Sequence, residues 1–333
     1  MKYLPQTLAI ILATTLVTPL QAAQELMIYS TKNASYLTPL LDRYSAETGT
    51  PVSYLIEPAS ALIARLETEG TQSKADILLT SSAASLWQAT QKGLTTAVDS
   101  NTLTDIIPAH LRSPDNHWFG FSKRTQTLIY NSAVLDKQQL KGYEDLADPK
   151  WEGNLCLRTA QQAYTQSLVA MLINRDGEQK TLATLQGWVY NQAVRPFAED
   201  SHIFPAMEQN ICDVSIVNSY YFARYKHDNP DTPLKLFWAD QDSSGVHVDI
   251  TGAAVTAHSD NKAGATDLLE WLVLKEAQAQ YAKLSHEYPV NKKVYPVREV
   301  GRRGKYSEDQ HNLSASGRYQ AQAVVLLKQA GYR

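Results

Sequence analysis

The stretch ELMIYSTKNASYLTPLLDRYSAETGTPVSYLIEP (residues 25–58) decides the fold class. It begins with an apolar run that ends at Ser30, continues with leucines at helical spacing as far as Gly49, and closes with a second apolar run over 52–56. The pattern then predicts a helix over 59–69, a strand over 75–80 and a helix over 83–91. Strands that alternate with helices at this spacing indicate a parallel sheet covered by helices.

The same alternation returns in the second half of the chain. We expect strands over 153–158 and 213–217, and helices over 166–174 and 182–191. Two longer strand-like stretches, 118–131 and 243–257, are placed where they can pass between two halves of the molecule. The sequence therefore predicts an α/β fold of two lobes, each a mixed sheet flanked by helices, joined by two hinge crossings.

Composition and charge narrow the function classes. The chain has 333 residues, of which 44% are hydrophobic and 20% charged, which is typical of a globular protein. Its 31 basic and 34 acidic residues give a net charge of −3, so we expect no nucleic-acid partner, because such binders carry a basic surplus. The 18 tyrosines, against 6 Phe and 6 Trp, mean that most aromatic side chains carry an oxygen.

The first 23 residues have the layout of a secretory signal peptide. Lys2 supplies a positive start, an apolar run extends from Leu8 to Leu20, and Ala22 and Ala23 provide small residues for cleavage. The alternative, a membrane anchor, is disfavoured because a spanning helix needs about 20 apolar residues. No cysteine lies near the cleavage point, so we expect no lipid anchor and a soluble chain exported to the periplasm.

Export to the periplasm bears on the oxidation state of the two cysteines. Cys156 and Cys212 are the only pair in the chain, and paired thiols in an oxidising compartment are usually oxidised. The sequence predicts a disulfide between them; the alternative is two buried free thiols. Two cysteines alone are too few for a metal site.

Two predicted strand-end loops carry tyrosines, and ligands of open α/β sheets bind at such ends. Tyr164 follows the strand over 153–158, and Asn218-Ser219-Tyr220-Tyr221 follows the strand over 213–217. Asn218 or Ser219 can cap the next helix, which places the tyrosine pair at a positive helix end. Ferric ion is hard and prefers anionic oxygen, so it would stabilise the phenolate form. The alternative is a tyrosine pair that packs in the core or stacks on a sugar.

The chain resembles the periplasmic ferric-ion-binding proteins, the substrate-binding subunits of iron ABC importers, which belong to the type II periplasmic binding proteins. The resemblance covers nearly the whole chain after the signal peptide. The segments that carry it are 29–32, 146–153, 158–159, 164–170, 212–221, 247–253 and 288–291. It implies that Tyr164, Tyr220 and Tyr221 bind Fe(III). It also implies a periplasmic monomer that hands iron to an ABC permease in the inner membrane and catalyses no reaction.

One departure from the family affects the predicted site. A branch of the family has Arg-His-Tyr in the first loop, where this chain has Lys32-Asn33-Ala34. Asn33 is a weak ferric ligand and Ala34 is none, so an anion such as carbonate, or water, would have to complete the coordination. Arg124 is the first candidate to hold that anion, because a guanidinium matches a planar oxyanion. Lys32 is the second candidate, and Arg158 would fix the tyrosine loop or the anion; the alternative for each is a solvated surface charge.

These expectations give the chain a domain plan and leave three rival readings open, one of which is a sensor partner that presents iron to a membrane kinase. The plan is a signal peptide over 1–23, a first lobe over 24–122 with 248–298, and a second lobe over 123–247 with 299–333. Another rival is the same fold binding a sugar, a polyamine or an oxyanion. The third is a secreted enzyme, for which Ser81-Ser82 is the only nucleophile candidate at a strand end, without the Gly-x-Ser-x-Gly elbow around it.

Overall fold

The computed structural model describes residues 24–301 and 304–333. The predicted signal peptide over 1–23 lies outside the described residues. Within the described ranges, no helix is long and apolar enough to cross a membrane.

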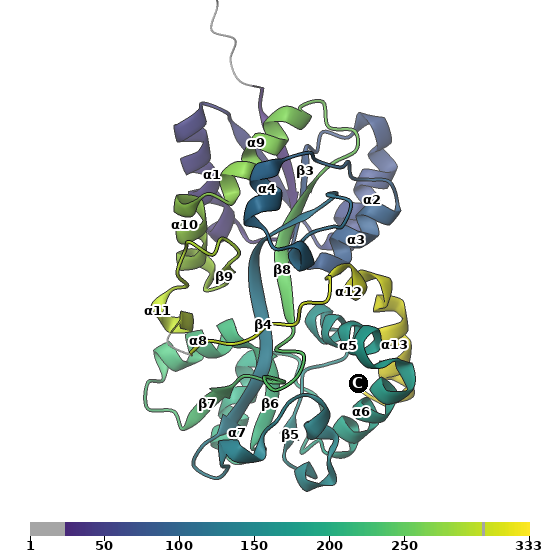
Figure 1. Ribbon diagram of the computed structural model, residues 1–333, viewed down its shortest axis with the longest axis vertical. Coiled ribbons are helices and arrows are strands. Elements are labelled where there is room, and N and C mark those ends of the chain that lie inside the picture. Colours follow the sequence, from purple (N-terminus) through teal and green to yellow (C-terminus); the bar gives the residue numbers. More distant parts are fainter. Residues whose placement is uncertain (1–23, 302–303) are drawn as a thin grey trace, which may run out of the picture.

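Two long strands run through the middle of the molecule and join its two halves (Figure 1). These are β4 (Phe119–Asn131) and β8 (Val248–Val255), which pair antiparallel with each other. The strand order is β2-β1-β3-β8-β4-β6-β5, with β7 and β9 also paired to β4. The strands β1 (Leu26–Ser30), β2 (Val52–Ile56) and β3 (Ile77–Thr80) are parallel, whereas β3 and β8 are antiparallel. The predicted two-lobed fold with mixed sheets is confirmed.

Helices cover both halves of the sheet (Figure 1). Those of the first half are α1 (Ala34–Thr48), α2 (Ala59–Glu69), α3 (Ala83–Gln91), α4 (Asn101–Ile106), α9 (Lys262–Leu272) and α10 (Lys275–Ser285). The second half has β5 (Leu155–Cys156), β6 (Val214–Asn218), β7 (Leu234–Phe237), α5 (Ala163–Asp176), α6 (Glu178–Tyr190), α7 (Ile203–Glu208), α8 (Ser219–Asp228) and α13 (Gln320–Gln329). The remaining elements, β9 (Tyr288–Pro289), α11 (Arg298–Gly301) and α12 (Ser314–Arg318), lie near the hinge.

The hydrophobic core is divided in the same way as the sheet. One buried cluster contains Leu26, Trp118 and Ile250 from the first half, and another contains Trp151 and Trp188 from the second. A smaller third cluster includes Phe204 and Phe222. Because each half buries its own apolar side chains, rotation of one half against the other leaves both cores intact.

The predicted disulfide is confirmed. Cys156 of β5 is bonded to Cys212, which lies two residues before the start of β6, and their Cα atoms are 5.8 Å apart. Both cysteines are buried, at 0% and 1% exposure. The bond therefore ties together two segments that lead into the candidate tyrosine loops.

Two predicted strands are shorter in the structure than in the sequence analysis. The strand expected over 153–158 is limited to residues 155–156, and the strand expected over 243–257 begins only at 248. The second difference has a local cause, since Asp240 and Gly245 have positive φ angles of 56° and 86°. The chain forms a turn between these two residues, so β8 begins only after this turn ends.

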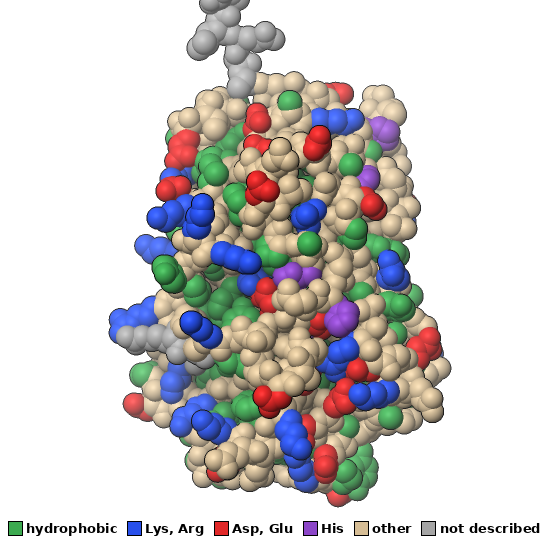
Figure 2. Space-filling view, in the orientation of Figure 1, with side chains coloured by type: hydrophobic (Ala, Val, Ile, Leu, Met, Phe, Trp, Pro, Cys, Tyr) green, Lys and Arg blue, Asp and Glu red, His purple; other side chains and the backbone are tan. Residues whose placement is uncertain are grey.

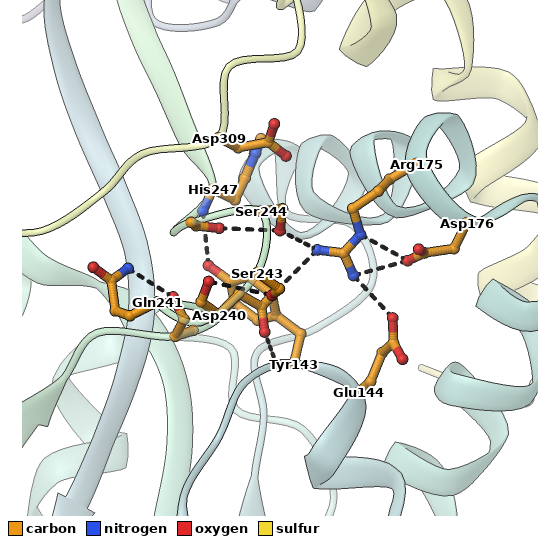
Figure 3. A network of polar contacts seen from close by, with 12 residues as sticks. Tyr143, Glu144, Arg175, Asp176, Asp240, Gln241, Ser243, Ser244, His247 and Asp309 are labelled. Carbon is orange, nitrogen blue, oxygen red and sulfur yellow. Dashed lines mark hydrogen bonds and ion pairs between the residues drawn. The ribbon is translucent and has the colours of Figure 1, made fainter.

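A polar network fixes the C-terminal end of α5 (Figure 3). Arg175 donates hydrogen bonds to Asp240 Oδ2 at 2.9 Å, to Ser244 Oγ at 2.6 Å and to Glu144 Oε1 at 3.1 Å. It also pairs with Asp176, at 2.8 Å. The helix is thereby attached to the turn before β8 and to the 144–147 segment. Because Tyr164 lies in the first turn of the same helix, the network helps to set the position of that tyrosine.

Candidate metal centre

The hinge strand β4 anchors both tyrosine loops through two consecutive residues. Thr125 donates a hydrogen bond to Ser219 Oγ at 2.5 Å, directly before the tyrosine pair. The next residue, Gln126, donates from Nε2 to the carbonyl oxygen of Tyr164 at 2.6 Å. Both Thr125 and Gln126 are fully buried, so these bonds are shielded from water. Both tyrosine loops are thus attached to neighbouring residues of the hinge strand.

Tyr220 and Tyr221 stand side by side in the first turn of α8. Their ring centroids are 4.1 Å apart and the ring planes are inclined at 34°. Burial raises the pKa of Tyr220 well above 10, as do its proximity and hydrogen bond to Tyr221, while nearby Arg124 acts in the opposite direction. The expected side-chain cap is absent: Asn218 is the cap residue but makes no capping bond, and the Ser219 hydroxyl is bonded to Thr125. A metal bound here would have to displace the proton of Tyr220.

Tyr164 is held by a buried ion pair. Its hydroxyl donates to Asp200 Oδ1 at 2.6 Å and accepts from Arg158 Nε at 3.0 Å, while Arg158 Nε also lies 2.9 Å from Asp200 Oδ2. Burial raises the pKa of Tyr164, the Asp200 carboxylate raises it further, and Arg158 lowers it. Among the residues that the structure describes, no hydrogen bond or ring contact joins Tyr164 to Tyr220 or Tyr221.

Asp200 was not predicted from the sequence. It begins a short 3-10 helix, Asp200–His202, and lies 36 positions from Tyr164. Only 3% of its surface is exposed, so the carboxylate depends on Arg158 and Tyr164 for its partners. No local pattern around residue 200 distinguishes it from a surface acid, and only the fold reveals its place.

Arg124, the first candidate for anion binding, is buried inside an ion cluster. Its Nη1 donates to Thr251 Oγ1 at 3.0 Å and its Nη2 to the carbonyl oxygen of Ile250 at 3.1 Å. Carboxylate oxygens of Glu287 and Asp249 lie 3.6 and 3.7 Å away. Burial lowers the pKa of Arg124, but the two carboxylates raise it by more, so the guanidinium stays charged. The alternative of a solvated surface charge does not fit a side chain that is 7% exposed.

Lys32, the second candidate, belongs to the same cluster. Its Nζ lies 2.6 Å from Glu287 Oε1, and Glu287 also accepts from Ser122 and, at 2.8 Å, from Thr251. Burial alone would raise the pKa of Glu287, but Lys32 and Arg124 lower it to about 2. Burial lowers the pKa of Lys32 and raises that of Asp249, and with all four groups ionised the two cations balance the two carboxylates.

Asn33 has a structural role in the first loop. It is the N-cap residue of α1 and accepts a hydrogen bond from the backbone N–H of Ser35 at 3.0 Å. Its side chain is exposed. This bond uses one of the two lone pairs of the side-chain amide oxygen and gives the side chain a capping role in α1.

A further residue, Arg224, joins the two halves across the cleft. Its Nη2 donates to the hydroxyl of Tyr36 in α1 at 2.9 Å and to the carbonyl oxygen of Ser285 at 3.2 Å. The guanidinium carbon also lies 5.3 Å from the centroid of the Tyr220 ring. Arg224 follows Tyr220 by four residues on α8, so helical spacing could have predicted that they share a face.

The donor set of the site is phenolic. In the described ranges, no group of three or more His, Cys, Asp or Glu side chains could hold a metal ion. The oxygens available around the two loops are those of Tyr164, Tyr220 and Tyr221, with the Asp200 carboxylate beside the first. Hard, ionisable oxygen ligands of this kind suit a trivalent cation better than zinc or copper.

Comparison with known proteins places the chain among binding proteins. Residues 40–311 match the family described as bacterial extracellular solute-binding protein. Iron uptake protein A1 of Synechocystis sp. is 35% identical, in an alignment that covers 93% of this chain and 88% of that protein. The Fe(3+)-binding periplasmic protein of Serratia marcescens is 25% identical and covers 93% of this chain and 91% of its own length.

Solved structures are similar over the same range. The Trichodesmium protein IdiA (FutA), in complex with iron and citrate, superposes with a TM-score of 0.89 and 34% identity. That match covers 93% of this chain and all of the Trichodesmium chain. A Bordetella ferric binding protein has a TM-score of 0.86 and 33% identity, covering 92% of this chain and 99% of its own. The predicted resemblance is confirmed, and the chain belongs to the family of bacterial extracellular solute-binding proteins.

Proposed function

We propose that the protein captures ferric ion with Tyr164, Tyr220 and Tyr221 and delivers it to an ABC importer. The observation that carries this proposal is the anchoring of both tyrosine loops on consecutive residues, Thr125 and Gln126, of the hinge strand. The relatives support it, because they are named for uptake or binding of iron and not for catalysis. The chain is accordingly a binding protein and not an enzyme.

Binding of ferric ion at this site would release the phenolic protons of the tyrosine ligands. The pKa values of Tyr164 and Tyr220 are raised, so both phenols are protonated at neutral pH before ferric ion arrives. Three phenolates would balance the 3+ charge of the ion, which favours their formation in a buried place. Tyr164 would exchange its hydrogen bond to Asp200 for the metal, and Arg158 would remain to stabilise the phenolate.

The remaining coordination positions would be filled by an anion such as carbonate, or by water. Arg124 and Lys32 stay the proposed anion partners, but Asp249 and Glu287 already compensate their charges. An anion would therefore gain less attraction from this cluster than from two unpaired cations. The Trichodesmium relative was solved in complex with iron and citrate, which supports citrate as an alternative anion here.

We further propose that capture works by closure of the two lobes. The first lobe would comprise 24–122 with 248–298, and the second 123–247 with 299–333. The bonds from Arg224 to Tyr36 and Ser285 would then hold the closed form across the cleft. The mature protein would act in the periplasm as a monomer, after removal of residues 1–23, and its partner would be a permease of the inner membrane.

Equilibrium dialysis against ferric citrate tests the assignment. Protein in bicarbonate buffer should retain one ferric ion per chain, and the double variant Tyr220→Phe/Tyr221→Phe should retain none under the same conditions. Tyr190→Phe is the matched control, because Tyr190 is 59% exposed on α6, away from the tyrosine loops. Equal retention by the double variant would rule out the tyrosine pair as ligands. Repeating the dialysis without bicarbonate asks whether carbonate is needed or whether citrate, itself a carboxylate ligand, can complete the coordination.

A further inference from the structure

A cavity lined by none of the candidate tyrosines lies at the hinge. Its volume is about 840 Å³, and in Figure 2 apolar side chains line a hollow near β9 and α11 with Lys and Arg side chains around it. No residue of the candidate metal centre lines this cavity. Pockets of about 300–1,000 Å³ at domain interfaces are the usual sites for small ligands.

The walls of this hinge pocket come from segments that are far apart in the sequence. Lys123 of β4 pairs in register with Tyr288 of β9, which forms one side. The segment over 304–310 forms the other side and is fixed to Val246, whose N–H bonds to the carbonyl oxygen of Ser307 at 2.9 Å. Since β4 and the residues that lead into β8 are the two hinge crossings, the width of the pocket depends on the angle between the lobes.

The floor and rim of the hinge pocket are aromatic. Tyr306 stacks on Trp238 with centroids 4.4 Å apart, and the edge of Tyr288 packs against Tyr306 at 5.3 Å. Tyr295 on the rim is 92% exposed, although its ring is a large partly apolar surface. Fixed aromatic walls of this kind suit a ligand with a flat apolar body.

The charge of the hinge pocket is positive although the whole chain carries −3. Three lysines and one glutamate line it: Lys123, Lys292, Lys305 and Glu308. Glu308 is bonded to Lys123 and lies 3.1 Å from His110 Nε2, so its charge is already compensated by Lys123. Lys292 and Lys305 are exposed, and neither forms an ion pair with any residue that the structure describes.

The geometry points to a binding site for a small organic anion with an aromatic or otherwise apolar body. The flat body would lie against Tyr288, Tyr295 and Tyr306, and the anionic group would be held by Lys292 and Lys305. An acidic peptide would find the same charges, but its carboxylate side chains have no flat apolar body to pack on the aromatic floor, so a single compact aromatic anion fits this open pocket better. A ligand that contacts both sides of the hinge also stabilises one lobe angle, so it would change iron affinity, and iron would change ligand affinity by the same factor. This coupling rests on the proposed function, whereas binding in the pocket does not.

The test uses 8-anilinonaphthalene-1-sulfonate, an aromatic sulfonate, as the probe with the iron-free mature protein. Fluorescence titration and calorimetry should give one saturable site per chain. The variant Lys292→Ala/Lys305→Ala should weaken binding by about 2- to 30-fold, as expected for the loss of two partly solvated ion pairs. Tyr295→Ala should weaken it as well. These three side chains are exposed, so the variants should keep the melting temperature of the parent protein.

Two matched controls separate the pocket from general charge and surface effects. Lys235→Ala/Lys262→Ala removes the same charge from exposed lysines outside the pocket, and Tyr190→Ala removes another exposed tyrosine. Both should leave probe affinity unchanged. The uncharged relative N-phenyl-1-naphthylamine should bind the parent protein more weakly than the sulfonate and should not respond to the lysine substitutions.

Several results would overturn the proposal. These are a lack of saturable binding, equal weakening by the pocket and control variants, and tight binding of a polyglutamate peptide where the sulfonate does not bind. The last result would assign the surface to a protein partner. Probe binding is also measured in Tyr220→Phe/Tyr221→Phe, where it should persist, so failure of the pocket and failure of the iron site are distinguishable.

Discussion

Replacing Glu287 with glutamine removes the carboxylate that lies beside both Lys32 and Arg124 in the buried ion cluster. Glu287 is 4% exposed, pairs with Lys32 at 2.6 Å and lies 3.6 Å from Arg124. Glutamine keeps the size of the side chain but removes the ion-pair partner of Lys32 and leaves Arg124 with Asp249, at 3.7 Å. Breaking a buried ion pair by removing one partner typically costs about 3–5 kcal/mol, because the remaining charge is left uncompensated.

The pKa of Glu287 gives an independent value for the free energy that this carboxylate contributes to folding. It falls from an ordinary value of about 4.3 in the unfolded chain to about 2 in the folded protein. At about 1.4 kcal/mol for each tenfold change in proton affinity, the folded environment favours the carboxylate by about 3 kcal/mol. Since the folded pKa is the lower one, this contribution is fully present above pH 4.3 and is lost as the pH falls toward 2.

Urea unfolding followed by tryptophan fluorescence measures the effect. At pH 7, Glu287→Gln should lower the free energy of unfolding by about 3 kcal/mol, and the difference from the parent protein should shrink to about 2 kcal/mol at pH 3.5. Glu276→Gln, at an exposed glutamate without a side-chain partner in the described ranges, should change stability by less than about 0.5 kcal/mol. A Glu287→Gln difference that is below 1 kcal/mol, or that grows in acid, would refute the reasoning.

Three further predictions follow from other parts of the structure. Cys156→Ser/Cys212→Ser opens a loop of 56 residues, and unfolding should become easier by about 4 kcal/mol in the loop-entropy estimate. His247 is buried and its pKa is lowered to about 4 by burial, so it is neutral when folded but takes up a proton on unfolding below about pH 6.5. Between pH 7 and pH 5 the parent protein should lose about 2 kcal/mol that His247→Gln does not lose. Arg224→Met should weaken ferric binding about 10- to 100-fold, because it removes charged hydrogen bonds across the cleft worth about 1.5–3 kcal/mol.

Each of these three has an outcome that would contradict it. Reduction of the parent protein should reproduce the stability of the double serine variant, and a stability that is insensitive to reductant would contradict the role of the disulfide. For His247, the same acid-induced loss in parent and variant would assign the pH dependence to other groups. For Arg224, iron affinity is compared with Lys226→Met on the same helix, and equal effects would show that the change is not specific to the contact across the cleft.

The bounds of helices were predicted best where neighbouring residues in the sequence determine where the helix ends. Gly49 ends α1 with a φ of 76°, and the predicted helices 59–69 and 83–91 have the observed bounds. The predicted elements stop at residue 257, yet α9, α10 and α13 follow in the structure. The order of strands was also beyond the sequence, because the antiparallel pairing of β3 with β8 joins residues more than 170 positions apart.

The sequence points to the candidate tyrosines but not to the residues that contact them. Tyr164 and the pair at 220–221 stand out because each follows a strand, which is a local pattern. Their partners are set by packing between distant segments: Glu287 lies 255 positions from Lys32, and Asp200 lies 36 positions from Tyr164. The charge of Arg124 is compensated by carboxylates that are distant in the sequence. The sequence around Arg124 therefore does not show that this charge is already paired.

The most direct test of the central claim is the visible absorption spectrum of the ferric-loaded protein. Iron bound by phenolates should give a charge-transfer band whose intensity rises to a plateau at one ferric ion per chain. The band should be lost in Tyr220→Phe/Tyr221→Phe, altered in Tyr164→Phe and unchanged in Tyr190→Phe. A protein that binds iron without colour, or a double variant with the unaltered band, would contradict the assignment of these tyrosines as ferric ligands.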